Sequence, residues 1–217
     1  MYEENLTKTS MLILKVTKKT QDVAIRAAVR VLKRGGVIAF PTETTYGLGC
    51  DPRKTDAVRR IYAIKGREKG KPLLLVASSV AQASRVGDLR AVPSSLQKKH
   101  WPGPLTLVVP ARTAAKLVKE IAPKGEVAVR VSSSEIVQAL TTRYGFPIVA
   151  TSANRSGEPD CRSGRAVSRA FEGSSDKPDL ILDMGSLPRR KPSTLARVTS
   201  SEEIEVLRQG AVRLASV

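Results

Sequence analysis

Short aliphatic runs recur along the chain, with segments of helical period between them, and this alternation constrains the fold most. The runs Val37–Phe40 and Leu73–Ala77 are far below the ~20 residues that a membrane-spanning helix needs. The second run lacks the alternation of apolar and polar residues that marks a half-buried strand, so we expect a strand that is covered on both faces. Because no repeat and no linker interrupts the pattern, we predict one domain of mixed α and β structure over 12–217, after a flexible N-terminal segment at 1–11.

The period of the apolar residues places the individual elements. The predicted helices are 21–34, 56–65, 79–85, 93–100, 135–144 and 165–171. The predicted strands are 11–16, 37–40, 73–77, 105–109, 127–131, 148–151, 180–183, 194–198 and 205–207. The segments 41–51 and 152–162 are expected to be polar loops. On the first helix, the stripe expected to face the core consists of Val23, Ala27, Ala28, Val31 and Leu32.

The charge balance narrows the function classes. The 217 residues include 37 Lys and Arg against 20 Asp and Glu, which gives a formal net charge of +17. Such a charge attracts polyanions and anionic ligands over long distances, so RNA, DNA, nucleotides and acidic membrane surfaces are candidate partners. The alternative interpretation is a generally basic protein whose cations form a solvated surface and bind no particular partner. Charge alone says nothing about sequence-specific contacts, and both interpretations stay open.

Scarce histidine and cysteine exclude several kinds of site. His100 is the one histidine, and Cys50 and Cys161 lie far apart and outside any CxxC pair. A zinc site would have to recruit several carboxylates, a disulfide framework is excluded, and a Ser-His-Asp triad could use only His100. Isolated cysteines suit a reducing compartment, and the N-terminal region lacks the apolar core of a secretory signal. We therefore expect a cytoplasmic protein without a membrane segment.

Two loops combine hydroxyl groups with a position at the end of a predicted buried strand. The loop Pro41–Asp51 carries three threonines, Thr42, Thr44 and Thr45, and is rich in glycine. The loop at 151–154 has the sequence Thr-Ser-Ala-Asn and follows another strand. In α/β folds, ligands bind where loops leave the ends of strands. Hydroxyl and amide groups there suit the recognition of a phosphate or a carboxylate.

Cations occupy every second position after the predicted helix 56–65. Lys65, Arg67, Lys69 and Lys71 would point to one face of an extended segment. Such a row could clamp a polyphosphate, with Arg67 making two-bond contacts that lysine cannot make. A solvated basic loop is the alternative. The segment is not a Walker A loop, because its glycines are spaced by three residues instead of four and no Ser or Thr follows the lysine.

Arg130 lies among apolar residues in a predicted strand, in the sequence VAVRV. A buried arginine needs an anionic partner, which is either a structural carboxylate or the carboxylate of a ligand. Both alternatives stay open. The chain lacks a general-base histidine beside a nucleophile and a paired-carboxylate motif. Its mixture of cations, hydroxyls and glycine loops suits the positioning and electrostatic stabilisation of phosphoryl or nucleotidyl transfer.

Taken together, the motifs resemble one known family over nearly the whole chain from about residue 12. The matching segments are GGVIAFPTETTYGLGCD at 35–51, IYAIKGREKGKPLLL at 61–75, WPGPLTLVVPA at 101–111, VAVRV at 127–131 and ATSANRSGEP at 150–159. In this order they resemble the YrdC/TsaC family of threonylcarbamoyl-AMP synthases. The resemblance implies an α/β (α+β) fold, with an open, twisted mixed sheet flanked by helices around a large basic cavity.

The resemblance also implies an activity. Members of the family convert L-threonine, bicarbonate and ATP into threonylcarbamoyl-AMP and pyrophosphate, with Mg²⁺ accompanying ATP and no protein metal site expected. The product feeds the t6A37 modification of tRNA through downstream threonylcarbamoyl-transferase proteins. By motif, L-threonine would contact Thr44, Arg130 and Ser193. ATP would contact Lys65, Arg67, Lys71, Ser152, Asn154 and Arg208, with Lys65 and Arg67 as catalytic residues.

The C-terminal tail departs from the family pattern. Many members have Ser-Thr followed by two aliphatic residues and Asp, whereas this chain has Ser-Thr-Leu-Ala-Arg ending at Arg197. The departure resembles the short bacterial branch of the family. Two alternatives to the synthase stay open. The net charge and the expected basic cavity allow a double-stranded RNA or tRNA-binding protein acting in rRNA or tRNA maturation, and the departures of the tail allow a nucleotide-binding regulator that has lost catalysis. Binding that weakens steeply with salt and ignores threonine and ATP would indicate the RNA-binding alternative.

Overall fold

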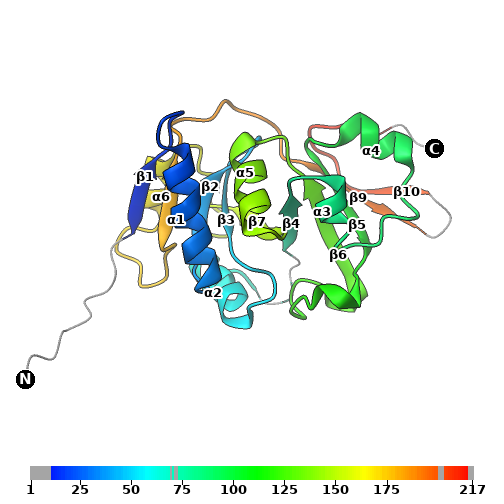
Figure 1. The fold of residues 1–217 in the computed structure, drawn as a ribbon, viewed down its shortest axis with the longest axis horizontal. Helices are drawn as coiled ribbons and strands as arrows, with labels where there is room; N and C mark the ends of the chain where they lie inside the picture. Colours follow the sequence, from blue (N-terminus) through cyan, green and yellow to red (C-terminus); the bar gives the residue numbers. More distant parts are fainter. Residues whose placement is uncertain (1–10, 69, 71–72, 200–202, 215–217) are drawn as a thin grey trace, which may run out of the picture.

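The computed structural model describes residues 11–68, 70, 73–199 and 203–214 (Figure 1). Its α-helices are α1 (Gln21–Lys33), α2 (Thr55–Lys65), α3 (Val80–Ala83), α4 (Ser94–His100), α5 (Glu135–Tyr144) and α6 (Gly164–Ala170). Its strands are β1 (Leu12–Lys15), β2 (Ile38–Pro41), β3 (Tyr46–Gly49), β4 (Leu74–Ala77), β5 (Leu105–Pro110), β6 (Glu126–Val131), β7 (Ile148–Ser152), β8 (Leu180–Asp183), β9 (Thr194–Val198) and β10 (Ile204–Arg208). Short 3₁₀ turns lie at Thr113–Ala115 and Pro123–Gly125.

The strands form one twisted mixed sheet in the order β1-β8-β2-β3-β7-β4-β6-β5-β9-β10. Among the described strands, four neighbouring pairs are parallel (β1 with β8, β8 with β2, β4 with β6, β5 with β9) and the other five are antiparallel. The predicted open mixed sheet flanked by helices is therefore confirmed. The chain leaves β8 and crosses the molecule to begin β9 near the other end of the sheet, so its C-terminal part lies far from β1 (Figure 1).

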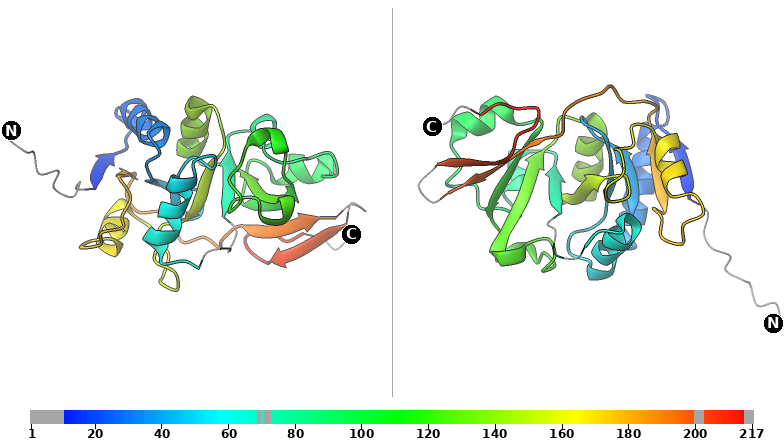
Figure 2. Two further views of the ribbon diagram at one scale, coloured as in Figure 1. Left: turned by 90° about the horizontal axis from the view of Figure 1, so that it is seen from below. Right: turned by 180° about the vertical axis from the view of Figure 1, so that it is seen from behind.

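Helices cover both faces of the first part of the sheet. Helices α1 and α5 pack against each other on one face, and α2 and α6 lie on the opposite face (Figure 2). Strand β2 shows why this works: Ile38 and Phe40 belong to the apolar cluster under α1 and α5, whereas Ala39 belongs to the cluster on the other side. Successive strand residues point to opposite faces, so a continuous apolar run is covered twice.

One expectation about this region is wrong. The segment 41–51, expected to be a loop, contains strand β3, which pairs antiparallel with both β2 and β7. Glycine is required within it, because a Cβ at Gly49 would lie 2.6 Å from the ring of Phe40 and would meet the main-chain oxygen of Val149. The true turn is the shorter segment 42–45. It connects the paired ends of the buried strands β2 and β3, and this pairing fixes its position.

The described helices include none that is long and apolar enough to cross a membrane. The expected flexible segment at 1–11 lies outside the described residues except for Met11.

Candidate active site

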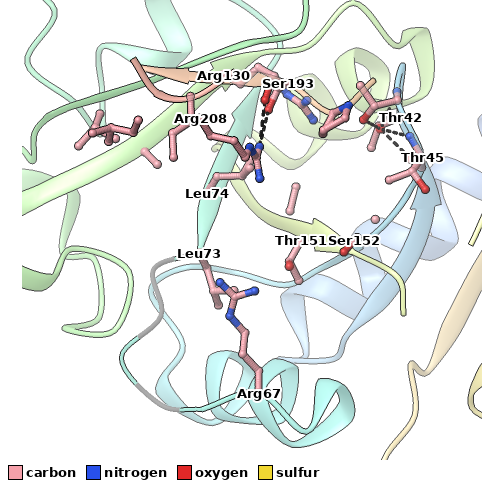
Figure 3. A pocket seen from close by; sticks show the side chains of 18 of the residues that line it. Thr42, Thr45, Arg67, Leu73, Leu74, Arg130, Thr151, Ser152, Ser193 and Arg208 are labelled. Carbon is pink, nitrogen blue, oxygen red and sulfur yellow. Dashed lines mark hydrogen bonds between the residues drawn. The ribbon is translucent and has the colours of Figure 1, made fainter. Parts of the chain in front are cut away.

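A cavity of about 780 Å³ opens along the middle of the sheet (Figure 3). Its wall is formed by the turn 42–45, the end of the segment after α2, strands β6 and β7, and the segments at 190–193 and 207–208. Among the described residues that line it, the acidic ones are Glu126 and Asp160. The basic ones are Arg67, Lys124, Arg130, Arg190, Arg197 and Arg208. The lining therefore favours anionic ligands.

The threonine turn supplies hydroxyl groups in a fixed arrangement. Thr42 Oγ1 accepts hydrogen bonds from the amides of Thr44 and Thr45, both at 3.2 Å, and donates to the carbonyl of Thr45 at 2.7 Å. Thr44 Oγ1 lies 3.1 Å from Thr42 Oγ1. The side chain of Thr45 donates to the carbonyl of Cys161 at 2.6 Å. Thr42 and Thr45 organise the turn, and Thr44 is held at the cavity wall.

Lys65, at the end of α2, lies behind the loop that follows β7. Its ammonium donates to the main-chain oxygen of Ser152 at 2.6 Å and to the main-chain oxygen and Oδ1 of Asn154 at 2.8 and 3.1 Å. Burial and then the charge of Arg67 lower the pKa of Lys65 to about 8. Three acceptors use all three donors of the ammonium. Lys65 is 2% exposed and does not line the cavity, so it supports the loop in this structure.

The structure brings Arg67 and Ser152 to the cavity wall (Figure 3). Asn154 is buried next to Lys65, and its amide donates to the carbonyl of Glu158. Lys71 and Lys69 lie outside the described residues, so the row of alternating cations stays a prediction beyond Arg67.

Arg130 on β6 has a carboxylate partner that the sequence did not identify. Glu43 Oε1 lies 3.5 Å from Arg130 Nε, and each side chain is 5% exposed. The other oxygen of Glu43 accepts a hydrogen bond from Ser132 Oγ at 2.6 Å. Glu43 lies in the PTETTYG motif, between Thr42 and Thr44. The signal that could have found it is the demand of a buried arginine for an anion, met by the acidic residue of the adjoining turn.

Ser193 and Arg208 meet at the part of the cavity wall that lies across from Arg67 (Figure 3). Arg208 Nη2 donates to the carbonyl of Ser193 at 3.0 Å and approaches its Oγ at 3.4 Å. Thr106 Oγ1, fully buried on β5, lies 3.0 Å from Ser193 Oγ. The parallel pairing of β5 with β9 and the hairpin of β9 with β10 bring these residues together. Arg190 and Arg197 also line the cavity and were not among the predicted site residues.

The described residues contain no group of three or more His, Cys, Asp or Glu side chains that could hold a metal ion. The carboxylates at the cavity differ in their surroundings. Glu126 makes an ion pair with Arg197 at 3.2 Å. The charge of Asp160 acts on Lys65 and opposes part of the decrease in its pKa. A divalent cation here would depend mainly on oxygens that a substrate brings, such as those of a polyphosphate.

Comparison with known proteins agrees with this geometry. The sequence model of the Sua5/YciO/YrdC family, described as telomere recombination, matches residues 30–210. A threonylcarbamoyl-AMP synthase of Thiobacillus denitrificans is 40% identical over 166 residues, which cover 76% of this chain and 85% of the relative.

Solved structures agree as well. The structure of P. abyssi Sua5 complexed with L-threonine has a TM-score of 0.80 and 33% identity, over 93% of this chain and 58% of that chain. The structure of E. coli YciO has a TM-score of 0.78 and 26% identity, over 94% of this chain and 97% of that chain. This chain thus spans a little over half the length of the P. abyssi protein and nearly all of the E. coli one. The chain is a member of the Sua5/YciO/YrdC family.

Proposed function

We propose that the protein is an L-threonylcarbamoyladenylate synthase, which converts L-threonine, bicarbonate and ATP into threonylcarbamoyl-AMP, pyrophosphate and water. The observation that carries the proposal is the single cavity in which Thr44, Arg130 and Ser193 face the same space as Arg67 and Arg208. Relatives that share up to 40% identity over most of this chain are named threonylcarbamoyl-AMP synthases. A related structure is described as complexed with L-threonine.

The proposed roles follow the chemistry of each group. Arg130 binds the carboxylate of threonine, and Thr44 and Ser193 offer hydrogen bonds to its polar groups. Arg67 and Ser152 bind ATP phosphates, and Arg208 lies over the nucleotide.

Two further residues of the proposed site act from behind the cavity wall. Lys65 and Asn154 hold the end of β7, which carries Ser152, and the loop that follows it, and the hydrogen bonds of the Lys65 ammonium support this role. We keep Lys65 and Arg67 as the residues on which turnover depends most, and Lys71 as a further ATP ligand.

The proposed reaction needs no side-chain nucleophile. The amine of L-threonine first bonds to the carbon of bicarbonate, and water leaves, which gives N-carboxythreonine. An oxygen of its carbamate group then attacks the α-phosphorus of ATP, the bond from that phosphorus to the bridging oxygen breaks, and pyrophosphate leaves. Fixed cations around the phosphates stabilise the charge that develops, and the cavity holds the two reactants in line. Mg²⁺ would accompany ATP and would neutralise charge on the phosphate oxygens.

The product would feed the t6A37 modification of tRNA, through threonylcarbamoyl-transferase proteins that take it over. Direct binding of tRNA or double-stranded RNA is the second proposal, because a net charge of +17 attracts polyanions over long distances. Both proposals are compatible, since the outer surface and the cavity are different parts of the molecule.

The deciding experiment mixes the purified protein with ATP, Mg²⁺ and bicarbonate, with and without L-threonine, and measures pyrophosphate and the AMP-linked product. Pyrophosphate release that requires both threonine and bicarbonate supports the synthase. The Arg67→Ala variant should lose this release and keep the melting temperature of the wild type. Bound ATP without release would indicate a regulator. RNA binding without ATP binding would indicate the second proposal instead.

A further inference from the structure

The carboxylate of Glu43 and the guanidinium of Arg130 meet in the wall of the cavity without a complete hydrogen bond. Their nearest atoms, Glu43 Oε1 and Arg130 Nε, are 3.5 Å apart. Both atoms are buried, and neither has a hydrogen-bond partner. Stability alone does not account for such a pair, because buried charged groups without hydrogen bonds cost free energy.

The geometry leaves one end of Arg130 for a ligand. Arg130 lines the cavity, whereas Glu43 does not, and Glu43 approaches from the Nε edge of the guanidinium. The two terminal nitrogens of a guanidinium match a carboxylate in a two-bond contact. A ligand carboxylate can therefore bind the terminal nitrogens while Glu43 stays at Nε. Figure 3 shows Arg130 beside Ser193 at this wall of the cavity.

Glu43 is itself held from two sides. Ser132, which directly follows β6, donates to Glu43 Oε2 at 2.6 Å, and Ser132 is fully buried. The Ser132 hydroxyl in turn accepts from the amide of Ser134 at 3.2 Å. The carbonyl of Glu43 accepts from Arg190 Nη1 at 3.4 Å. Glu43 thus connects the threonine turn to the end of the strand that carries Arg130.

We infer that Glu43 positions Arg130 for the carboxylate of the amino-acid substrate. The inference rests on the proposed function, which puts that carboxylate at Arg130. Glu43 offsets the charge of the guanidinium before the substrate binds and fixes its plane, and it does not touch the substrate. The opposite role would be that of a carboxylate that occupies the ligand position and has to be displaced. The two roles predict opposite changes in threonine affinity when the charge of Glu43 is removed.

The test is the Glu43→Gln variant, which keeps the shape of the side chain and an acceptor for Ser132. Initial rates of pyrophosphate release are measured with threonine varied at saturating ATP, and then with ATP varied at saturating threonine. We expect the KM for threonine to rise about tenfold, because the buried guanidinium loses its only anionic neighbour among the described residues. The KM for ATP should stay within about twofold of the wild type.

A matched control is Glu205→Gln, which removes a carboxylate that does not line the cavity from its 3.0 Å ion pair with Arg197. Arg197 keeps Glu126 as a second carboxylate partner at 3.2 Å. Glu205→Gln should leave the KM for threonine unchanged. Ser132→Ala is a second test that keeps both charges. It releases one oxygen of Glu43 and should raise the KM for threonine less than Glu43→Gln does. Melting temperatures of all variants identify any that fail to fold, and Ser132→Ala keeps the inference testable if Glu43→Gln is among them.

The double variant Glu43→Gln with Arg130→Lys separates positioning from a general loss of stability. Lysine has no Nε edge for Glu43 to hold, so the added effect of Glu43→Gln on threonine should fall to within about twofold in that background. Threonine affinity is also measured by calorimetry, which does not require turnover. No pyrophosphate release together with threonine binding that Glu43→Gln weakens rejects the proposed function and keeps the inference. An unchanged or tighter threonine affinity in Glu43→Gln, or an equal rise of both KM values, overturns it.

Discussion

Lys65 and Asn154 are joined twice: the Lys65 ammonium donates to the main-chain oxygen of Asn154 at 2.8 Å and to its Oδ1 at 3.1 Å. A third hydrogen bond, to the carbonyl of Ser152, measures 2.6 Å. The end of α2 therefore supports, from behind, the loop that presents Ser152 to the cavity. The order of a loop proposed to bind phosphate depends on one buried charge.

Removal of that charge should disturb the loop before it disturbs the rest of the fold. In Lys65→Met, three acceptors lose their donor, two of them on the buried Asn154, so we expect the KM for ATP to rise at least about tenfold and the melting temperature to fall. Lys54→Met is the matched control, because Lys54 also donates to a main-chain oxygen, that of Lys33 at 2.8 Å, at the other end of the same helix. It should leave the KM for ATP unchanged. A Lys65→Met enzyme with the ATP affinity of the wild type would contradict the supporting role.

The same group gives the site a pH dependence above neutrality. Burial and then the charge of Arg67 lower the pKa of Lys65 from 10.5 to about 8, and Asp160 and Cys161 act in the opposite direction. Loss of the proton removes one of the three donors, so the KM for ATP should rise as the pH rises through about 8. Stability follows the opposite sign. The pKa of this group is about 8 in the folded protein and 10.5 in the unfolded chain. Between these two pH values the unfolded chain keeps the proton and the folded protein has lost it. The contribution of Lys65 to the free energy of unfolding therefore increases as the pH rises through this range.

The KM for ATP, measured from about pH 7 to about pH 9, tests the expected rise. Lys65→Arg is the appropriate comparison, because a guanidinium does not titrate in this range. Its KM for ATP should lose the upward inflection near pH 8 that the wild type shows. An inflection of the same size in both proteins would assign it to another group.

Most elements follow from local sequence, and the exceptions have physical causes. Strand β3 escaped prediction because Tyr-Gly-Leu-Gly lacks β-branched residues, and its extended form depends on pairing with β2 and β7 on either side. On α1, Val23 was expected to face the core but is 54% exposed. Ala28 and Leu32 of the expected stripe are buried, and the other buried positions are Ala24, Ile25 and Val29. Alanines and valines on neighbouring stripes make both choices plausible locally, and packing against α5 decides between them.

The candidate site likewise has features that follow from local sequence and features that depend on the packed fold. That Arg130 needs an anion follows from its apolar surroundings, but its pairing with Glu43, 87 positions away, depends on the sheet that brings β6 to the threonine turn. Likewise, Lys65 looks like a phosphate ligand in a row of cations. Only the packed structure shows that the β7 loop already uses its three donors.

Ser193 combines a structural with a proposed binding role, and the two can be separated. In Ser193→Ala, the buried Thr106 hydroxyl loses its partner, which should cost about 1–3 kcal/mol of unfolding free energy. The KM for threonine should rise as well. The double variant Ser193→Ala with Thr106→Val removes both partners, so it should regain most of the stability and keep the raised KM. Urea unfolding and threonine-dependent pyrophosphate release measure the two effects. If the KM recovers together with the stability, Ser193 has no direct role in threonine binding.

Gly49 and Gly47 offer a test of how tightly β3 is enclosed. In Gly49→Ala, the new methyl group would lie 2.6 Å from Phe40 Cε1 and would meet the carbonyl of Val149, and neither a core ring nor a paired strand can move away cheaply. We expect a loss of about 1–3 kcal/mol in unfolding free energy. In Gly47→Ala, the nearest atom is the carbonyl oxygen of Thr151 at 3.4 Å, so the loss should be clearly smaller. Urea unfolding of the two variants gives the comparison. Equal losses would mean that β3 tolerates no side chain at either position, and that the close approach of Phe40 is not what requires glycine at position 49.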